Sequence, residues 1–181
     1  MSILKTLCFC FFTVLFFTAS VAHATPINRA TAEAYFENCK KNEDPRFPKK
    51  VQATFCACTA AELMKSFTLE EMQATAQQNQ AGRKATNKLI TDIYAPCIQY
   101  PAKTYHYNTC IKDPKSGILG NAEKICSCSA KLVANHLQAN AKPMFEKILR
   151  TNPNVTDPMQ ALYDDPDFQK LIQSKSLSCV Q

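Results

Sequence analysis

Two Cys-x-Cys pairs are the residues of this chain whose type and spacing could do chemistry: Cys56 with Cys58, and Cys126 with Cys128. Reduced thiols this close together can bind a soft metal ion such as Cu(I). Four further cysteines lie at matched distances around the pairs: Cys39, Cys97, Cys110 and Cys179. Because an even set of cysteines is typical of an exported chain with a disulfide framework, we expect structural bridges in preference to a metal site.

The sequence lacks the other common signatures of catalysis and cofactor binding. With only three glycines, the chain has no phosphate-binding or dinucleotide-binding loop, both of which need Gly at fixed offsets. The cysteine spacing fits neither the usual zinc patterns nor the Cys-x-x-Cys redox motif. No Ser-His-Asp order, nucleophile elbow or metalloprotease helix is visible. The sequence therefore predicts no catalytic residue, metal site or cofactor, and it favours a protein that is not an enzyme.

The first residues are typical of a cleaved signal peptide. Lys5 precedes an uncharged apolar run that ends in Ala22-His23-Ala24, the small-x-small pattern that signal peptidases cut. We expect cleavage to remove residues 1–24, and a retained N-terminal anchor is the alternative. No later stretch is apolar for long enough to cross a bilayer. The sequence thus predicts a periplasmic or secreted protein without stable membrane insertion after cleavage.

The charge of the chain bears on its partners. The formal net charge is +6 and falls to +5 when Lys5 leaves with the signal peptide. This mild basic excess is spread along the chain, so it fits a solvated surface better than a nucleic-acid groove. We therefore expect no nucleic-acid partner.

The cysteines of the two halves fall into register. The first cysteine precedes the pair by 17 positions in one half and 16 in the other, and the last follows it by 39 and 51. The flanking residues match as well: YFENC faces HYNTC, FCACTA faces ICSCSA, and Lys-Leu-Ile stands at one distance before Cys97 and Cys179. The sequence therefore predicts a tandem duplication. Its units are 25–99 and 100–181, divided at Tyr100-Pro101, where proline disfavours a continuous helix.

The fold class that we expect is all-α: two tandem, duplicated helical units, each a disulfide-stapled helix hairpin plus one or two further helices. In the first unit, apolar residues at spacings of three and four predict helices over 28–42 and 49–66. The capping-box pattern from Thr68 to Glu71 starts another helix. A last helix is expected to stop at Pro96, since proline is poorly tolerated in a helix interior.

The second unit repeats this plan with about a dozen extra residues. Its second helix carries apolar residues as far as Leu137, and Lys142-Pro143 is expected to open a third helix. Thr156-Asp157-Pro158 predicts a short helix in the extra segment. The acidic residues at 164–167 lack the spacing of a calcium loop and fit the start of the last helix.

The two histidines beyond residue 24 give little support for a ligand role. His106 aligns with Tyr35 of the first half, and His136 aligns with Ser66. Because neither counterpart is a histidine, we expect both to be partly exposed surface residues.

Three tyrosines lie at the predicted junction, in the stretch YPAKTYHY. We expect Tyr107 to pack as Phe36 does, and Tyr100 and Tyr105 to seal the join between the units. A groove or partner site lined by these aromatic residues is the alternative.

Four cysteines per unit allow three pairings. A bridge within Cys56-x-Cys58 is geometrically poor, and the two residues, about 200° apart around a helix, must reach different partners. If the hairpin turns between about 43 and 48, Cys39 lies nearer to Cys56 than to Cys58. This offset favours Cys39–Cys56 with Cys58–Cys97, and by repetition Cys110–Cys126 with Cys128–Cys179. The alternative, Cys39–Cys58 with Cys56–Cys97, stays open because rotation of the helix could outweigh the offset.

These observations favour an exported, non-enzymatic, disulfide-rich helical protein that binds a protein or another macromolecule, such as an envelope partner, through its helical surfaces. The alternative is a periplasmic protein that handles soft metals or thiols with the Cys-x-Cys pairs. A small hydrolase or a carrier of an apolar ligand is a third possibility, since helical bundles can hold pockets that no motif announces.

Overall fold

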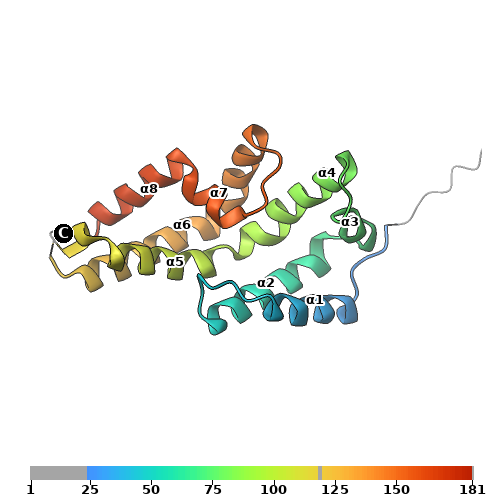
Figure 1. The fold of residues 1–181 in the computed structure, drawn as a ribbon, viewed down its shortest axis with the longest axis horizontal. Coiled ribbons are helices and arrows are strands. Elements are labelled where there is room, and N and C mark those ends of the chain that lie inside the picture. The colour runs from blue at the N-terminus through green and yellow to red at the C-terminus, as the bar shows by residue number, and fades with distance from the viewer. Residues whose placement is uncertain (1–23, 118–119, 181) are drawn as a thin grey trace, which may run out of the picture.

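A computed structural model describes residues 24–117 and 120–180 (Figure 1). The predicted signal peptide lies outside the described residues except for Ala24. The described residues form eight α-helices and no β-strand, which confirms the all-α prediction. The helices are α1 (Arg29–Lys41), α2 (Lys49–Ser66), α3 (Leu69–Ala74), α4 (Gln80–Lys88), α5 (Gln99–Lys112), α6 (Ala122–Thr151), α7 (Pro158–Asp164) and α8 (Pro166–Leu177).

Side-chain caps fix where most of these helices begin. The Asn28 side chain accepts from the backbone nitrogen of Thr31 at the start of α1. The expected capping box opens α3, where Thr68 and Glu71 bond to each other's backbone nitrogens. Asp157 caps α7, as the sequence predicted. Such caps satisfy nitrogens that have no partner within the helix.

The chain does not break at Pro96. A π-helix (Leu89–Tyr94) and a 3₁₀-helix (Ala95–Cys97) follow α4 directly and lead into α5. Pro101 sits in the first turn of α5, where a backbone N–H has no helical partner to lose. The expectation that a helix stops at Pro96 was therefore wrong. Figure 1 shows the resulting helical stretch, from α4 to α5, running along the length of the molecule.

Pro143 does not open a helix either. It lies inside α6, a single helix of 30 residues. Ala141 and Phe145, two positions to either side of it, are buried in the core, and this packing favours a continuous helix across the proline. The predicted division of this segment into two helices was therefore wrong. Among the helices of the described ranges, α6 included, none is both long and apolar enough to cross a membrane.

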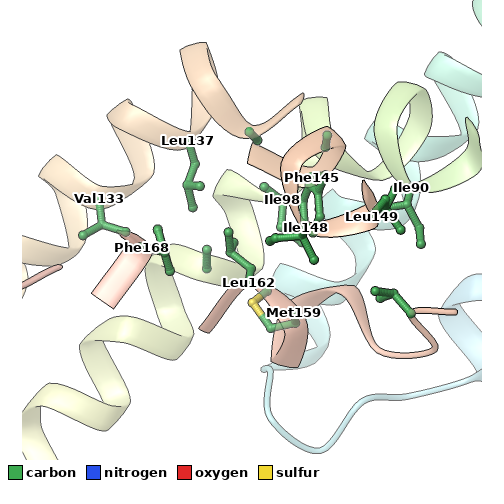
Figure 2. Packing of buried hydrophobic residues seen from close by; sticks show 14 residues of the cluster. Ile90, Ile98, Val133, Leu137, Phe145, Ile148, Leu149, Met159, Leu162 and Phe168 are labelled. Carbon is green, nitrogen blue, oxygen red and sulfur yellow. The ribbon is translucent and has the colours of Figure 1, made fainter. Parts of the chain in front are cut away.

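The largest hydrophobic cluster draws residues from both sides of the predicted unit boundary. Ile90 and Ile98 come from the first half, and they meet side chains of α6, α7 and α8 (Figure 2). The fully buried residues of this cluster include Leu137, Phe145, Leu162 and Phe168. The buried residues of the second, smaller cluster all lie in the first half: Ile27, Ala32, Leu63, Phe67 and Ile93. The two halves thus share the larger cluster, and α6 is its central element because it packs against α5, α7 and α8.

Candidate functional site

All eight cysteines that follow the predicted signal peptide are paired. The four disulfides are Cys39–Cys56, Cys58–Cys97, Cys110–Cys126 and Cys128–Cys179. This is the connectivity that the sequence favoured, because Cys39 was expected to lie nearer along the helix axis to Cys56 than to Cys58. The paired Cα atoms lie 5.6 to 5.9 Å apart, the usual span of a disulfide.

The paired state bears directly on the metal hypothesis. A soft metal ion needs thiolate ligands, and the sulfurs of a disulfide are not thiolates. In residues 24–117 and 120–180 there is also no group of three or more His, Cys, Asp or Glu side chains placed to hold a metal ion. The structure therefore presents the Cys-x-Cys residues as bridges between helices.

His106 is not a surface residue, contrary to expectation. It is 4% exposed, and its Nε2 atom lies 2.8 Å from the Oγ atom of Ser129 on α6. Burial lowers the pKa of His106. Sequence reasoning missed this position because the partner hydroxyl comes from another helix. His136 is partly exposed, as predicted, and burial together with the nearby Lys175 lowers its pKa.

The junction tyrosines divide into two roles. Tyr105 packs between the halves, with its ring centroid 6.4 Å from that of Phe47 and 4.7 Å from that of Tyr163. Tyr100 is 41% exposed, so the expectation that it seals the join was wrong. Tyr107 is half-buried. Tyr100 and Tyr107 both line a surface groove. This position agrees with the alternative interpretation of the stretch, a groove lined by its aromatic residues.

This groove lies where α2, α5 and α6 meet and has a volume of about 550 Å³. We call it the α2–α5–α6 groove. Its lining residues are Lys50, Val51, Thr54, Gln99, Tyr100, Lys103, Thr104, Tyr107, Ser127, Ala130, Lys131, Ala134 and Asn135. The lining contains three lysines and two tyrosines but no carboxylate. One basic side chain comes from each of the three helices.

The lysines of the groove are exposed and available to a ligand. Lys50, Lys103 and Lys131 are all exposed, and the ion pairs found among the described residues involve other cations. Three ammonium groups around one groove attract a negatively charged group. The tyrosine rings add apolar area and hydroxyl groups, which favours an interface role. The sequence could not predict this grouping, because the three lysines are far apart along the chain.

No family model, no curated protein and no solved structure matches this chain.

Proposed function

We propose that this chain is an exported, non-enzymatic interaction module that binds an acidic segment of a partner protein in the α2–α5–α6 groove. The observation that carries the proposal is the set of three exposed lysines around two tyrosines, with no carboxylate in the lining. Each lysine–carboxylate pair at such a surface contributes at most about 1 kcal/mol. The charges therefore act mainly on the rate and selectivity of association, and the tyrosines supply the apolar contact.

Disulfides support a binding role because they hold the walls of the groove in place. The helix α2 carries Cys56 and Cys58, α5 carries Cys110, and α6 carries Cys126 and Cys128. Each wall is thus covalently tied to another element. A surface that is already ordered loses less conformational entropy on binding, which leaves more of the contact energy as affinity.

Cleavage of the expected signal peptide would place the new N-terminus beside a carboxylate. The backbone nitrogen of Thr25 lies 3.0 Å from Oε2 of Glu70. Hydrogen bonding to Thr25, mainly through its side chain and also through this backbone nitrogen, helps to lower the pKa of Glu70 to about 2. Cleavage after Ala24 converts that amide into a positively charged terminus facing the carboxylate. The disulfides favour an oxidising compartment, the periplasm or the outside of the cell. N-terminal sequencing of protein recovered from that compartment should begin at Thr25; a chain that keeps residues 1–24 would contradict this part of the proposal.

A labelled decaglutamate peptide tests the groove. We expect saturable binding by fluorescence anisotropy at about 0.1 M salt, and no binding of decalysine. Replacing Lys50, Lys103 and Lys131 by Gln should weaken decaglutamate binding by about tenfold or more. The matched control replaces three exposed lysines outside the groove by Gln and makes the same change in net charge: Lys41, Lys84 and Lys124.

The control variant distinguishes binding in the groove from general attraction of the acidic peptide to lysines anywhere on the surface. The control variant should keep its affinity within about twofold, since screening confines exposed charges to roughly 10 Å. Equal losses in the two triple variants would overturn the groove as the binding site. A Tyr100→Ala variant adds a second readout, because it should weaken binding without changing the salt dependence.

A further inference from the structure

A buried polar cluster joins three helices in the second half. His106 on α5 lies 2.8 Å from the hydroxyl of Ser129 on α6, which lies 2.9 Å from the hydroxyl of Ser176 on α8. Ser129 is completely buried and His106 is nearly so. We call these three residues the His106 cluster.

Three residues at matching positions form a similar cluster in the first half. Tyr35 and His106 each stand four positions before the first cysteine of their half, and Thr59 and Ser129 each stand three positions after the first member of the Cys-x-Cys pair. Tyr94 and Ser176 each stand three positions before the last cysteine.

Tyr35 has both Thr59 and Tyr94 as polar neighbours. Burial and the neighbouring Tyr94 raise the pKa of Tyr35 above its ordinary value, and hydrogen bonding to Thr59 opposes this rise. Thr59 is fully buried, as Ser129 is. Both halves therefore place a polar cluster at the same point between their helices.

Each cluster lines a cavity. Tyr35 and Tyr94 line one of about 450 Å³, and His106 and Ser176 line one of about 580 Å³. Five further pairs of matched positions line the two cavities: Asn38 and Thr109, Cys39 and Cys110, Asn42 and Asp113, Asp44 and Lys115, and Phe55 and Ile125. The two cavities are therefore equivalent places in the two halves.

The equivalent cavities differ at the two matched positions where the first has the aromatic rings of Tyr94 and Phe55. In the first, the phenol ring of Tyr94 forms part of the wall and lies 5.7 Å, centroid to centroid, from the ring of Phe55. In the second, Ser176 and Ile125 occupy these positions, and the aromatic ring of Tyr163 comes to the wall from α7 instead. At these two matched positions the larger cavity thus keeps the hydroxyl group of the cluster but has no aromatic ring.

We propose that the larger cavity binds a small phenol, an uncharged aromatic ring with one hydroxyl group, at the place that the Tyr94 ring takes in the first half. Ile125, Ile172 and Leu177 provide apolar contact for the ring. A serine hydroxyl can donate one hydrogen bond and accept two, so Ser176 keeps capacity for the ligand hydroxyl beside its bond to Ser129.

Charge in the ligand is disfavoured at this place. The ring would lie against a nearly buried imidazole and apolar side chains, where an ionised carboxylate loses its hydration. The cavity wall carries one carboxylate, Asp113, and one ammonium group, Lys115, so it offers an anion no net attraction. This site is separate from the function proposed above, because it shares no lining residue with the α2–α5–α6 groove.

Titration with p-cresol, the side chain of tyrosine as a free molecule, tests the proposal on the disulfide-bonded protein. We expect saturable binding that shifts the imidazole NMR signals of His106. Toluene lacks the hydroxyl group and benzoate is charged, so both should bind about tenfold more weakly. Equal affinity for toluene, or the absence of saturable p-cresol binding, would overturn the proposal.

Two variants at one position separate the ring from the hydroxyl group. Ser176→Tyr supplies the ring covalently and should weaken p-cresol binding by about tenfold or more. Ser174→Tyr, at an exposed position of α8, is the matched control and should leave binding unchanged. Ser176→Ala keeps the space but removes the hydroxyl group, so it should weaken binding of p-cresol and not of toluene. Binding that survives both Ser176 variants would place p-cresol elsewhere and contradict the assignment.

Discussion

Arg46 binds Asp157 across 111 positions of the chain: Nη1 donates to Oδ2 at 2.8 Å, and Nη2 donates to Oδ1 at 3.3 Å. The same guanidinium group binds Asp44, which raises the pKa of Arg46 and lowers that of Asp44. Asp157 also accepts from the backbone nitrogen of Gln160 as the cap of α7. The loop between α1 and α2 is thus tied to the start of α7, so a directional ion pair supplements the shared core at the join.

A double-mutant cycle measures this pair. Arg46→Met keeps the apolar stem of the side chain, and Asp157→Asn keeps a capping residue at the start of α7. Because the side chains are 29% and 43% exposed, we expect a coupling of about 0.5–1 kcal/mol in urea unfolding at low salt. The coupling should shrink at about 1 M salt, where the Debye length is roughly 3 Å. Zero coupling at low salt would show that the contact does not stabilise the join.

The oxidation state decides between the interaction module and the soft-metal or thiol-handling alternative. Protein recovered from the oxidising compartment, without the segment that contains Cys8 and Cys10, should show no free thiol when denatured without reductant. Non-reducing peptide mapping should recover the four pairs described above. Four or more free thiols would contradict the disulfide framework and favour the soft-metal or thiol-handling alternative.

Pro143 lowers the stability of α6, and its replacement should raise it. A proline within a helix removes one backbone hydrogen bond, and Pro143 is exposed, so its ring contributes little packing. Pro143→Ala should stabilise the protein by about 1–3 kcal/mol in urea unfolding. Pro166→Ala is the matched control, because Pro166 begins α8, where a backbone nitrogen has no hydrogen-bond partner within the helix. This substitution should change the free energy of unfolding by no more than about 1 kcal/mol. A destabilised Pro143→Ala variant would contradict this account.

Local signals in the sequence predicted the parts of the fold that local chemistry controls. The α1–α2 hairpin, the capping box at Thr68 and the start of α7 at Asp157 all follow from side chains within one turn of the helix ends. Proline was a misleading signal at two positions. At Pro96 and Pro143, buried neighbours on both sides anchor the chain in the core, and this long-range packing outweighs the local preference for a break.

The candidate sites depend on tertiary contacts that no periodicity reveals. Lys50 and Lys131 lie far apart in the sequence and meet only because α2 and α6 both border α5. His106 is buried only because Ser129 and Ser176 come to it from other helices. The cysteine register predicted which positions correspond between the halves, but not that these positions line cavities. The tandem duplication itself stays a prediction, which the matched cavities support.

Acid should weaken the fold through His106. Burial lowers its pKa below the ordinary value near 6.5, so the unfolded chain binds a proton more readily than the folded one. The resulting stability is fully present above about pH 6.5 and is lost as the pH falls toward the lowered pKa. The ionisable residues that line the same cavity are Asp113, Lys115 and Tyr163.

Urea unfolding between pH 7.5 and 5.5 checks whether the free energy of unfolding falls as the pH falls. The wild-type protein should lose stability over this range, and His106→Gln, which keeps a side chain able to hydrogen-bond Ser129, should lose less. His136→Gln is the matched control, because His136 is more exposed than His106 and lies outside the cluster. Because the pKa of His136 is lowered too, its removal should also reduce the pH dependence, but by less than removal of the more buried His106. The substitution His106→Gln removes the imidazole group. If this variant retained the full pH dependence, the His106 imidazole would be excluded as the source of the pH dependence.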